Sequence, residues 1–103
     1  MLSLFQSVPA ISTRDFAATL TTKTKVIDVR TPSEYREGHI RQAINVPLNK
    51  IANYSGKKEP LYVICQSGAR SKQAAKLLTK MGYDATTIRG GMNQWQGPIQ
   101  GGK

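Results

Sequence analysis

The residues best suited to chemistry lie in one short stretch, Cys65-Gln66-Ser67-Gly68-Ala69-Arg70. This stretch follows an apolar run, Leu61–Ile64, and precedes a long amphipathic pattern that begins near Ser71, an order typical of strand, loop and helix. A cysteine at the carboxyl end of a buried strand lies at the sheet edge where ligands bind in open α/β folds. The unpaired N–H groups at the start of the helix face the same place and favour the thiolate. The pattern therefore predicts an enzyme with Cys65 as its nucleophile.

Strand and helix patterns alternate along the rest of the chain. Short strands are expected at 8–11, 25–29, 43–47, 61–64 and 84–88. Helices are expected after Ser12, from Thr31 to about Gly38, from Ser71 to Met81 and around Trp95, with a weak helical turn at 48–52. This alternation predicts an α/β fold whose central, mostly parallel sheet of about five short strands is flanked by helices on both faces.

Two helix starts carry capping signals. Ser12 and, three residues later, Asp15 open the first helix, whose buried face should include Phe16, Ala17 and Leu20. The second helix is expected to begin with a capping box at residues 31–34, in which threonine is the N-cap, proline the first helical residue and glutamate the acid. Both helices would then be set locally, before any contact with the sheet.

Length and charge limit the classes of partner. At 103 residues the chain has the size of one domain, and we expect a single domain over residues 1–103 with a flexible tail at about 98–103. Fifteen Lys and Arg against six Asp and Glu give a formal net charge of +9, which favours anionic partners. The charges are spread along the chain, and the runs Lys23–Lys25 and Lys57-Lys58 lack interleaved aromatic residues. Nucleic acid is therefore not the expected partner.

The same composition predicts the compartment. No apolar run is long enough to span a bilayer, and Met1–Ser7 lacks the basic and apolar regions of a secretory signal. Cys65 is the single cysteine, so it cannot form an internal disulfide and suits a reducing compartment. We expect a cytoplasmic protein with no membrane partner.

Several motifs along the chain resemble those of the single-domain rhodanese family (thiosulfate sulfurtransferase-like). They cover most of the chain from about Ile11 to Trp95 in the family's order: Asp28-Val29-Arg30, Glu34-Tyr35, Gly38-His39-Ile40, Ala43 to Pro47, Cys65 to Ser71, Gly82-Tyr83 and Arg89 to Trp95. The resemblance implies the rhodanese α/β fold and sulfurtransferase activity. In that activity the loop cysteine takes a sulfane sulfur from a donor such as thiosulfate, becomes a persulfide, and passes the sulfur to cyanide or a thiol. No cofactor and no metal are expected.

The loop has features that suit this chemistry. The residues expected to bind the substrate follow the catalytic Cys65 directly: Gln66, Ser67, Gly68, Ala69, Arg70 and Ser71. A curled loop can point successive backbone N–H groups at a persulfide, and Gly68 permits the left-handed torsion that the curl requires. Arg70 closes the loop with a charge suited to the oxygens of thiosulfate. Ser71 is expected to cap the helix and to donate to the same anion.

Three further residues are expected to support the loop. Asp28 and Arg30 should form a polar network beside it, with Arg30 also a lesser candidate for binding substrate. His39 is the single histidine and has no metal-ligand spacing with Cys65, so a structural hydrogen-bonding role is favoured over that of a base. Because no second cysteine can resolve the persulfide, the acceptor must be external: cyanide, a small thiol or a partner protein.

Two other functions remain open at the level of sequence. A cysteine-dependent phosphatase or arsenate reductase also pairs a loop cysteine with an arginine, but four residues between Cys65 and Arg70 make a loop too small for phosphate. A persulfide carrier that docks on a partner protein would use the same loop, and the basic surface mildly favours docking on acidic proteins.

Overall fold

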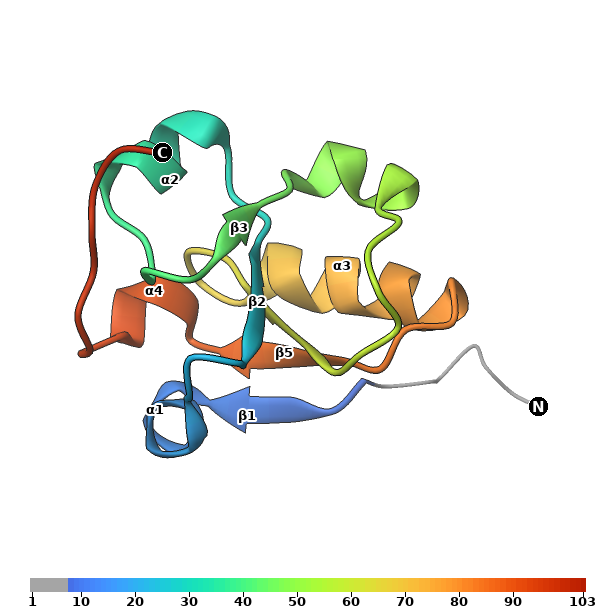
Figure 1. Ribbon diagram of the computed structural model, residues 1–103, viewed down its shortest axis with the longest axis horizontal. Helices are drawn as coiled ribbons and strands as arrows, with labels where there is room; N and C mark the ends of the chain where they lie inside the picture. Colours follow the sequence, from blue (N-terminus) through green and yellow to red (C-terminus); the bar gives the residue numbers. More distant parts are fainter. Residues whose placement is uncertain (1–7) are drawn as a thin grey trace.

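Five strands form one parallel sheet in the order β1-β5-β4-β2-β3. The structure is a computed structural model that describes residues 8–103, so the expectation about a signal at Met1–Ser7 lies outside the described residues. The strands are β1 (Ala10–Ser12), β2 (Lys25–Asp28), β3 (Ile44–Asn45), β4 (Leu61–Ile64) and β5 (Ala85–Arg89). The helices are α1 (Thr13–Thr19), α2 (Pro32–Glu37), the 3-10 helix η2 (Leu48–Asn53), α3 (Ala69–Lys80) and α4 (Gly91–Gln94). The predicted α/β class and parallel sheet are confirmed (Figure 1).

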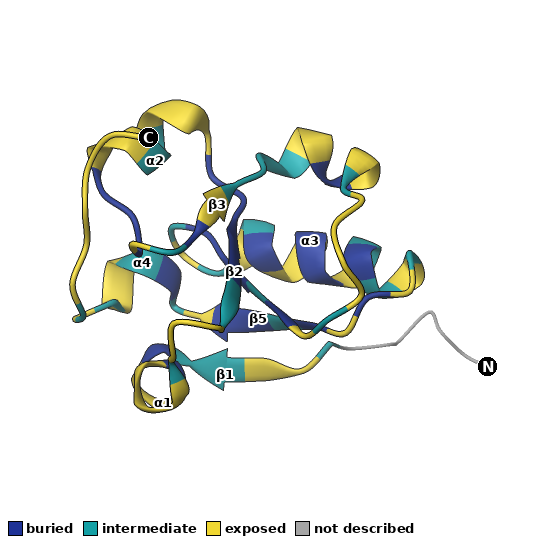
Figure 2. Ribbon diagram, viewed as in Figure 1, coloured by how far each residue is buried: buried dark blue, intermediate teal, exposed yellow. Residues whose placement is uncertain are grey.

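Strand β4 lies in the middle of the sheet, between β5 and β2. Its residues alternate between two faces, and each face has its own core. Val63 packs with residues of α3, including Ala74 and Leu78, whereas Ile64 packs in a second cluster with Phe16 of α1. Helices therefore cover both faces, and Figure 2 shows buried residues concentrated on the inner strands and on the sheet-facing side of α3. The carboxyl end of β4, where the cysteine follows, is held from both sides.

The first helix starts as predicted but buries less than predicted. The Ser12 hydroxyl accepts the backbone N–H of Asp15 at 3.0 Å, and Phe16 is fully buried. Ala17 is exposed, so its assignment to the buried face was wrong. The reason is the shortness of the seven-residue helix, which turns only Thr13 and Phe16, three positions apart, toward the core.

The second helix has both hydrogen bonds of a capping box. The Thr31 hydroxyl accepts the Glu34 N–H at 3.2 Å, and the Glu34 carboxylate accepts the Thr31 N–H at 3.0 Å. Pro32 is the first helical residue, and the helix ends before Gly38. These predictions are confirmed because each depends on residues within one turn.

The carboxyl-terminal segment pairs with the region after α2. We expected a flexible tail at about 98–103, but Gln100 forms an antiparallel bridge with His39, with two backbone hydrogen bonds of 2.9 Å. The Gly102 N–H also donates to the Arg36 carbonyl at 2.9 Å. This attachment could not be read from the glycine-rich sequence, because it uses backbone groups alone. Among residues 8–103, no helix combines the length and hydropathy that a membrane span requires.

Candidate active site

Cys65 lies directly after β4 and is fully buried. The Gly68 N–H donates to its Sγ at 3.0 Å, so the chain curls back over the sulfur within three residues. Gly68 makes this curl possible with a φ of 109°, in the left-handed region that favours glycine. Helix α3 begins at the next residue, Ala69, and its first turn therefore starts beside the sulfur.

Hydrogen bonding shifts the thiol of Cys65 toward its charged form. Burial raises the pKa of Cys65, but the Ser71 hydroxyl and the backbone N–H groups of Ser71, Gly68 and Ser67 more than offset this, and the pKa lies below its ordinary value. A thiolate stabilised in this way is a competent nucleophile.

Ser71 does not cap α3, which corrects the expectation from the sequence. The helix starts two residues earlier with Gly68 as its N-cap, and no side chain caps it. Ser71 is fully buried in the first turn, where its hydroxyl donates to the Gly68 carbonyl at 3.1 Å and lies 2.7 Å from the hydroxyl of Thr87. The left-handed glycine replaces the side-chain cap, because it turns the chain sharply enough to start the helix at once.

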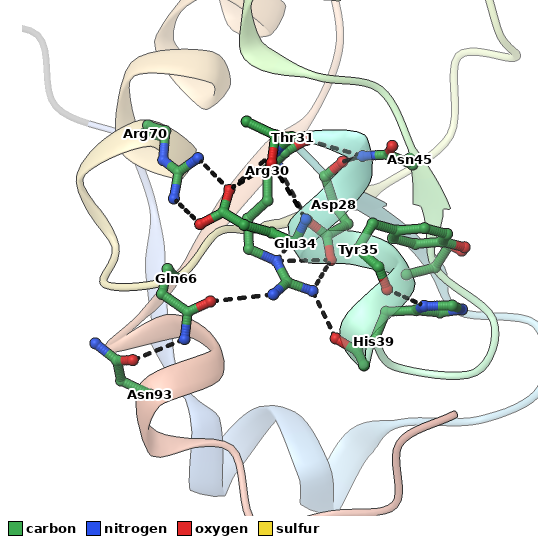
Figure 3. A network of polar contacts seen from close by, with 12 residues as sticks. Asp28, Arg30, Thr31, Glu34, Tyr35, His39, Asn45, Gln66, Arg70 and Asn93 are labelled. Carbon is green, nitrogen blue, oxygen red and sulfur yellow. Dashed lines mark hydrogen bonds and ion pairs between the residues drawn. The ribbon is translucent and has the colours of Figure 1, made fainter. Parts of the chain in front are cut away.

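Arg70 is paired with a carboxylate of α2. Its Nη1 and Nη2 donate to Oε1 and Oε2 of Glu34 at 2.8 and 3.0 Å (Figure 3). The Arg70 guanidinium lowers the pKa of Glu34 to about 2, and Glu34 in turn raises the pKa of Arg70. The arginine closes the loop by attachment to a second element, an arrangement that its position in the sequence did not indicate.

Asp28 and Arg30 form a buried ion pair at the end of β2. The Arg30 guanidinium donates to both Asp28 carboxylate oxygens, at 2.8 to 3.2 Å, and its Nη2 also donates to the Gly38 carbonyl at 2.8 Å. Its Nη1 donates to Gln66 Oε1 at 3.0 Å, and Gln66 Nε2 donates to Asn93 at 2.7 Å (Figure 3). The network joins three elements to the loop, and the contacts of Arg30 are internal to it.

The turn between β5 and α4 supports the loop from another side. The N–H groups of Met92 and Asn93 donate to the carbonyls of Cys65 and Gln66 at 2.8 and 2.9 Å. Gly91 allows this approach: its φ is 55°, and a Cβ placed there would lie 2.3 Å from the Cys65 carbonyl oxygen. The backbone of Cys65 is thus fixed on the side opposite to the curl.

His39 is buried away from any hydrogen bond with the loop. Its Nδ1 lies 2.7 Å from the Tyr35 carbonyl, and its ring stacks on the Tyr35 ring at 3.6 Å between centroids. Its Nε2 has no hydrogen-bond partner among residues 8–103. The contacts are those of a structural residue that holds α2 against the chain that follows it.

A cavity of about 410 Å³ borders the loop residues Ser67, Gly68 and Ala69. Its other walls include Lys72 and Thr87, so a buried hydroxyl and a cation lie beside the loop. A cavity of this volume is large enough to hold a small molecule.

The predicted site residues therefore come together, except His39, while other contributors were missed. Glu34 was recognised for its capping box alone, although its place in the family motif was a signal for more. Asn93 lies in the Arg89–Trp95 motif but carried no specific expectation. Thr87 gave no signal, since a threonine in a strand is ordinary.

Residues 12–98 of the chain match the rhodanese-like domain family. The chain belongs to the rhodanese-like family. The thiosulfate sulfurtransferase PspE of Escherichia coli is 35% identical over 71 residues, which cover 64% of this rhodanese-like chain and 68% of PspE. The putative sulfur carrier protein YrkF of Bacillus subtilis is 32% identical over 100 residues, or 91% of this chain, and the chain spans only 54% of YrkF. A solved structure of a rhodanese with anions from E. coli has a TM-score of 0.66 at 32% identity and covers 77% of this chain and 100% of that one.

Proposed function

We propose that this rhodanese-like protein is a sulfurtransferase that moves a sulfane sulfur through a persulfide on Cys65. The observation that carries the proposal is the fully buried sulfur at the end of β4, which receives the Gly68 N–H at 3.0 Å and has a lowered pKa. Similarity to PspE, a thiosulfate sulfurtransferase, supports the same reaction class. The free thiol suits a reducing compartment, and a cytoplasmic location is part of the proposal.

The reaction needs a thiolate and a place for negative charge. The Cys65 thiolate attacks the outer sulfur of thiosulfate, a new S–S bond forms, and the old S–S bond breaks as sulfite leaves with its electron pair. The product carries its charge on the terminal sulfur of Cys65–S–S⁻. Cyanide or a thiolate then attacks that sulfur and regenerates the Cys65 thiolate. No resolving cysteine is available, so the acceptor comes from outside the chain.

The curled loop supports this assignment. The N–H groups that lower the pKa of Cys65 belong to successive residues of the loop and the first turn of α3, and such a run of donors favours an anion. Arg70 lies next to this turn, and a doubly charged donor would compete with Glu34 for its guanidinium. We assign Arg70 to donor binding on this basis.

A thiosulfate-to-cyanide assay tests the proposal. Wild-type protein should form thiocyanate, and Cys65→Ser should reduce the rate to background while remaining folded. Lys76→Ala, on the exposed face of α3, is the matched control and should keep the wild-type rate. Wild-type protein that forms no thiocyanate with any of several donors, including thiosulfate and organic persulfides, would refute the catalytic part of the proposal.

A persulfide carrier is the second candidate, and similarity to the putative sulfur carrier YrkF favours it. A carrier would hold the Cys65 persulfide without passing it to cyanide. Mass spectrometry after exposure to a persulfide donor separates the two functions: a rise of one sulfur atom with no thiocyanate indicates the carrier. Cys65-dependent turnover of p-nitrophenyl phosphate would instead indicate a phosphatase and overturn both.

A further inference from the structure

Two buried hydroxyls lie together beside the cysteine loop. The Ser71 Oγ in the first turn of α3 and the Thr87 Oγ1 on β5 are 2.7 Å apart. Ser71 is 0% exposed and Thr87 is 4% exposed, so the contact is shielded from bulk solvent. The pair forms because α3 packs directly on β5. Ser71 contributes to the setting of Cys65, whereas Thr87 has no role in the reaction described above.

The hydrogen bonds of the pair indicate the direction of donation. The Ser71 hydroxyl has one proton and two oxygen acceptors in reach, Thr87 Oγ1 at 2.7 Å and the Gly68 carbonyl at 3.1 Å. The Thr87 hydroxyl has Ser71 as its one side-chain partner among residues 8–103. If Ser71 donated to Thr87, the Thr87 proton would lose its acceptor; if Thr87 donates to Ser71, both protons are used.

The Gly68 carbonyl is not dependent on Ser71. It also accepts the backbone N–H of Lys72 at 3.2 Å. The Ser71 proton can therefore turn from this carbonyl to the sulfur when the sulfur becomes a thiolate, and no buried acceptor is left without a partner. The Ser71 hydroxyl already contributes to lowering the pKa of Cys65.

We propose that Thr87 is a positioning residue whose hydroxyl donates to Ser71 and so directs the single Ser71 proton toward Cys65. Thr87 touches neither the sulfur nor the donor; it acts through Ser71. Its importance for sulfur transfer rests on the proposed function, but its effect on the thiol does not, since alkylation of a thiolate requires no sulfur donor.

The charged groups around the cysteine do not involve Thr87. They are Arg70 on α3, Glu34 on α2, and Asp28 with Arg30 at the end of β2. Within residues 8–103 none of them is hydrogen-bonded to Thr87, whose other bond runs from its backbone N–H to the Pro9 carbonyl. A substitution of the Thr87 side chain therefore leaves these charges in place.

The experiment measures the rate of iodoacetamide alkylation of Cys65 against pH. Thr87→Val removes the hydroxyl while keeping a branched side chain that suits a strand, and it should raise the alkylation midpoint by about 0.5. Thr87→Ser keeps the hydroxyl and should restore the wild-type midpoint. Thr86→Val, at the neighbouring position of β5, is the matched control and should leave the midpoint unchanged.

A double-mutant cycle separates this role from a packing effect. Ser71→Ala should raise the midpoint by about 1, and adding Thr87→Val to it should produce no further rise. A wild-type midpoint in Thr87→Val, or a rise of the same size in the Ser71→Ala background, would overturn the proposal. Thr87→Ala provides a second hydroxyl-free variant with the same expected rise if the valine protein does not fold. Failure of this experiment leaves the thiocyanate assay unaffected, and the reverse also holds.

Discussion

Arg70 and Glu34 form a bidentate ion pair that joins the first turn of α3 to α2, with N–O distances of 2.8 and 3.0 Å. About one third of each side chain is exposed, so solvent screens the pair and a ligand can exchange with it. The arginine that closes the cysteine loop is therefore held ready but is already neutralised. An anionic donor has to compete with Glu34 for it.

Glu34→Gln should strengthen donor binding. Glutamine also serves at the third position of a capping box, so α2 keeps its start while Arg70 loses its competing charge. We expect KM for thiosulfate to fall by about two- to fivefold, the range that an exposed ion pair supports. Because the pKa of Glu34 is about 2, the carboxylate stays charged from about pH 5 upward, and the effect should be constant there. Glu37→Gln, at the exposed end of the same helix, is the control, and an equal fall in KM in both variants would contradict the prediction.

Arg70→Ala should impair the use of thiosulfate. The loss of a charge-assisted contact worth about 1.5–3 kcal/mol corresponds to an increase of about tenfold or more in KM. Persulfide on Cys65, once formed, should decay at nearly the wild-type rate, as followed by mass spectrometry. Lys76→Ala removes a cation from the exposed face of the same helix and should have little effect. An unchanged KM in Arg70→Ala would exclude the arginine from donor binding.

The alkylation of Cys65 should show a midpoint below that of an ordinary thiol. The Ser71 hydroxyl and the loop N–H groups favour the thiolate enough to overcome the effect of burial. Since the pKa is lowered, the thiolate form is populated below the free-thiol value of about 8.5 and is lost as the pH falls through the lowered pKa. Iodoacetamide kinetics on the protein and on a small free thiol in the same buffers provide the comparison. Coincident midpoints for the two would mean that the loop does not stabilise the thiolate.

Gly91→Ala should displace the loop. The residue has a φ of 55°, and an added Cβ would lie 2.3 Å from the Cys65 carbonyl oxygen and 2.7 Å from that of Gln66. We expect a loss of about 2 kcal/mol or more in the free energy of unfolding, measured in urea, together with loss of thiocyanate formation. Gly102→Ala is a matched control, since Gly102 also has a positive φ, 82°, but nothing lies within 4 Å of its Cβ position. Equal losses in the two variants would show that backbone torsion alone matters.

Asp28→Asn should destabilise the fold strongly. Asp28 is fully buried and Arg30 is 4% exposed, so the variant leaves a guanidinium without its counter-charge in the interior. Breaking a buried pair in this way costs about 3–5 kcal/mol in the free energy of unfolding. Glu59→Gln, which removes the exposed partner of Lys25 at 3.9 Å, should change it by less than about 1 kcal/mol. Urea denaturation of both variants tests the difference, and similar values would argue against a structural role for the buried pair.

Much of this architecture was readable because it is local. The capping box at Thr31 and Glu34, the left-handed Gly68 and the apolar strand before Cys65 each depend on residues a few positions apart. The alternation of such segments predicts a parallel sheet, and the motif order identifies the family. The sequence by itself thus determined the fold class, the place of the cysteine at a strand end, and the absence of a resolving cysteine.

Tertiary structure decided which partners the loop side chains have. Glu34 lies 36 residues before Arg70, and Thr87 lies 16 residues after Ser71, so no local pattern links them. Short side chains such as those of threonine and serine fit many surroundings, and only the packing of α3 against β5 brings these two hydroxyls within 2.7 Å. The start of α3 at Ala69 was likewise a matter of three dimensions, because the curl over the sulfur replaced the side-chain cap expected at Ser71. The chemistry of the cysteine was legible in the chain, whereas the groups that tune it depend on contacts that only the folded protein makes.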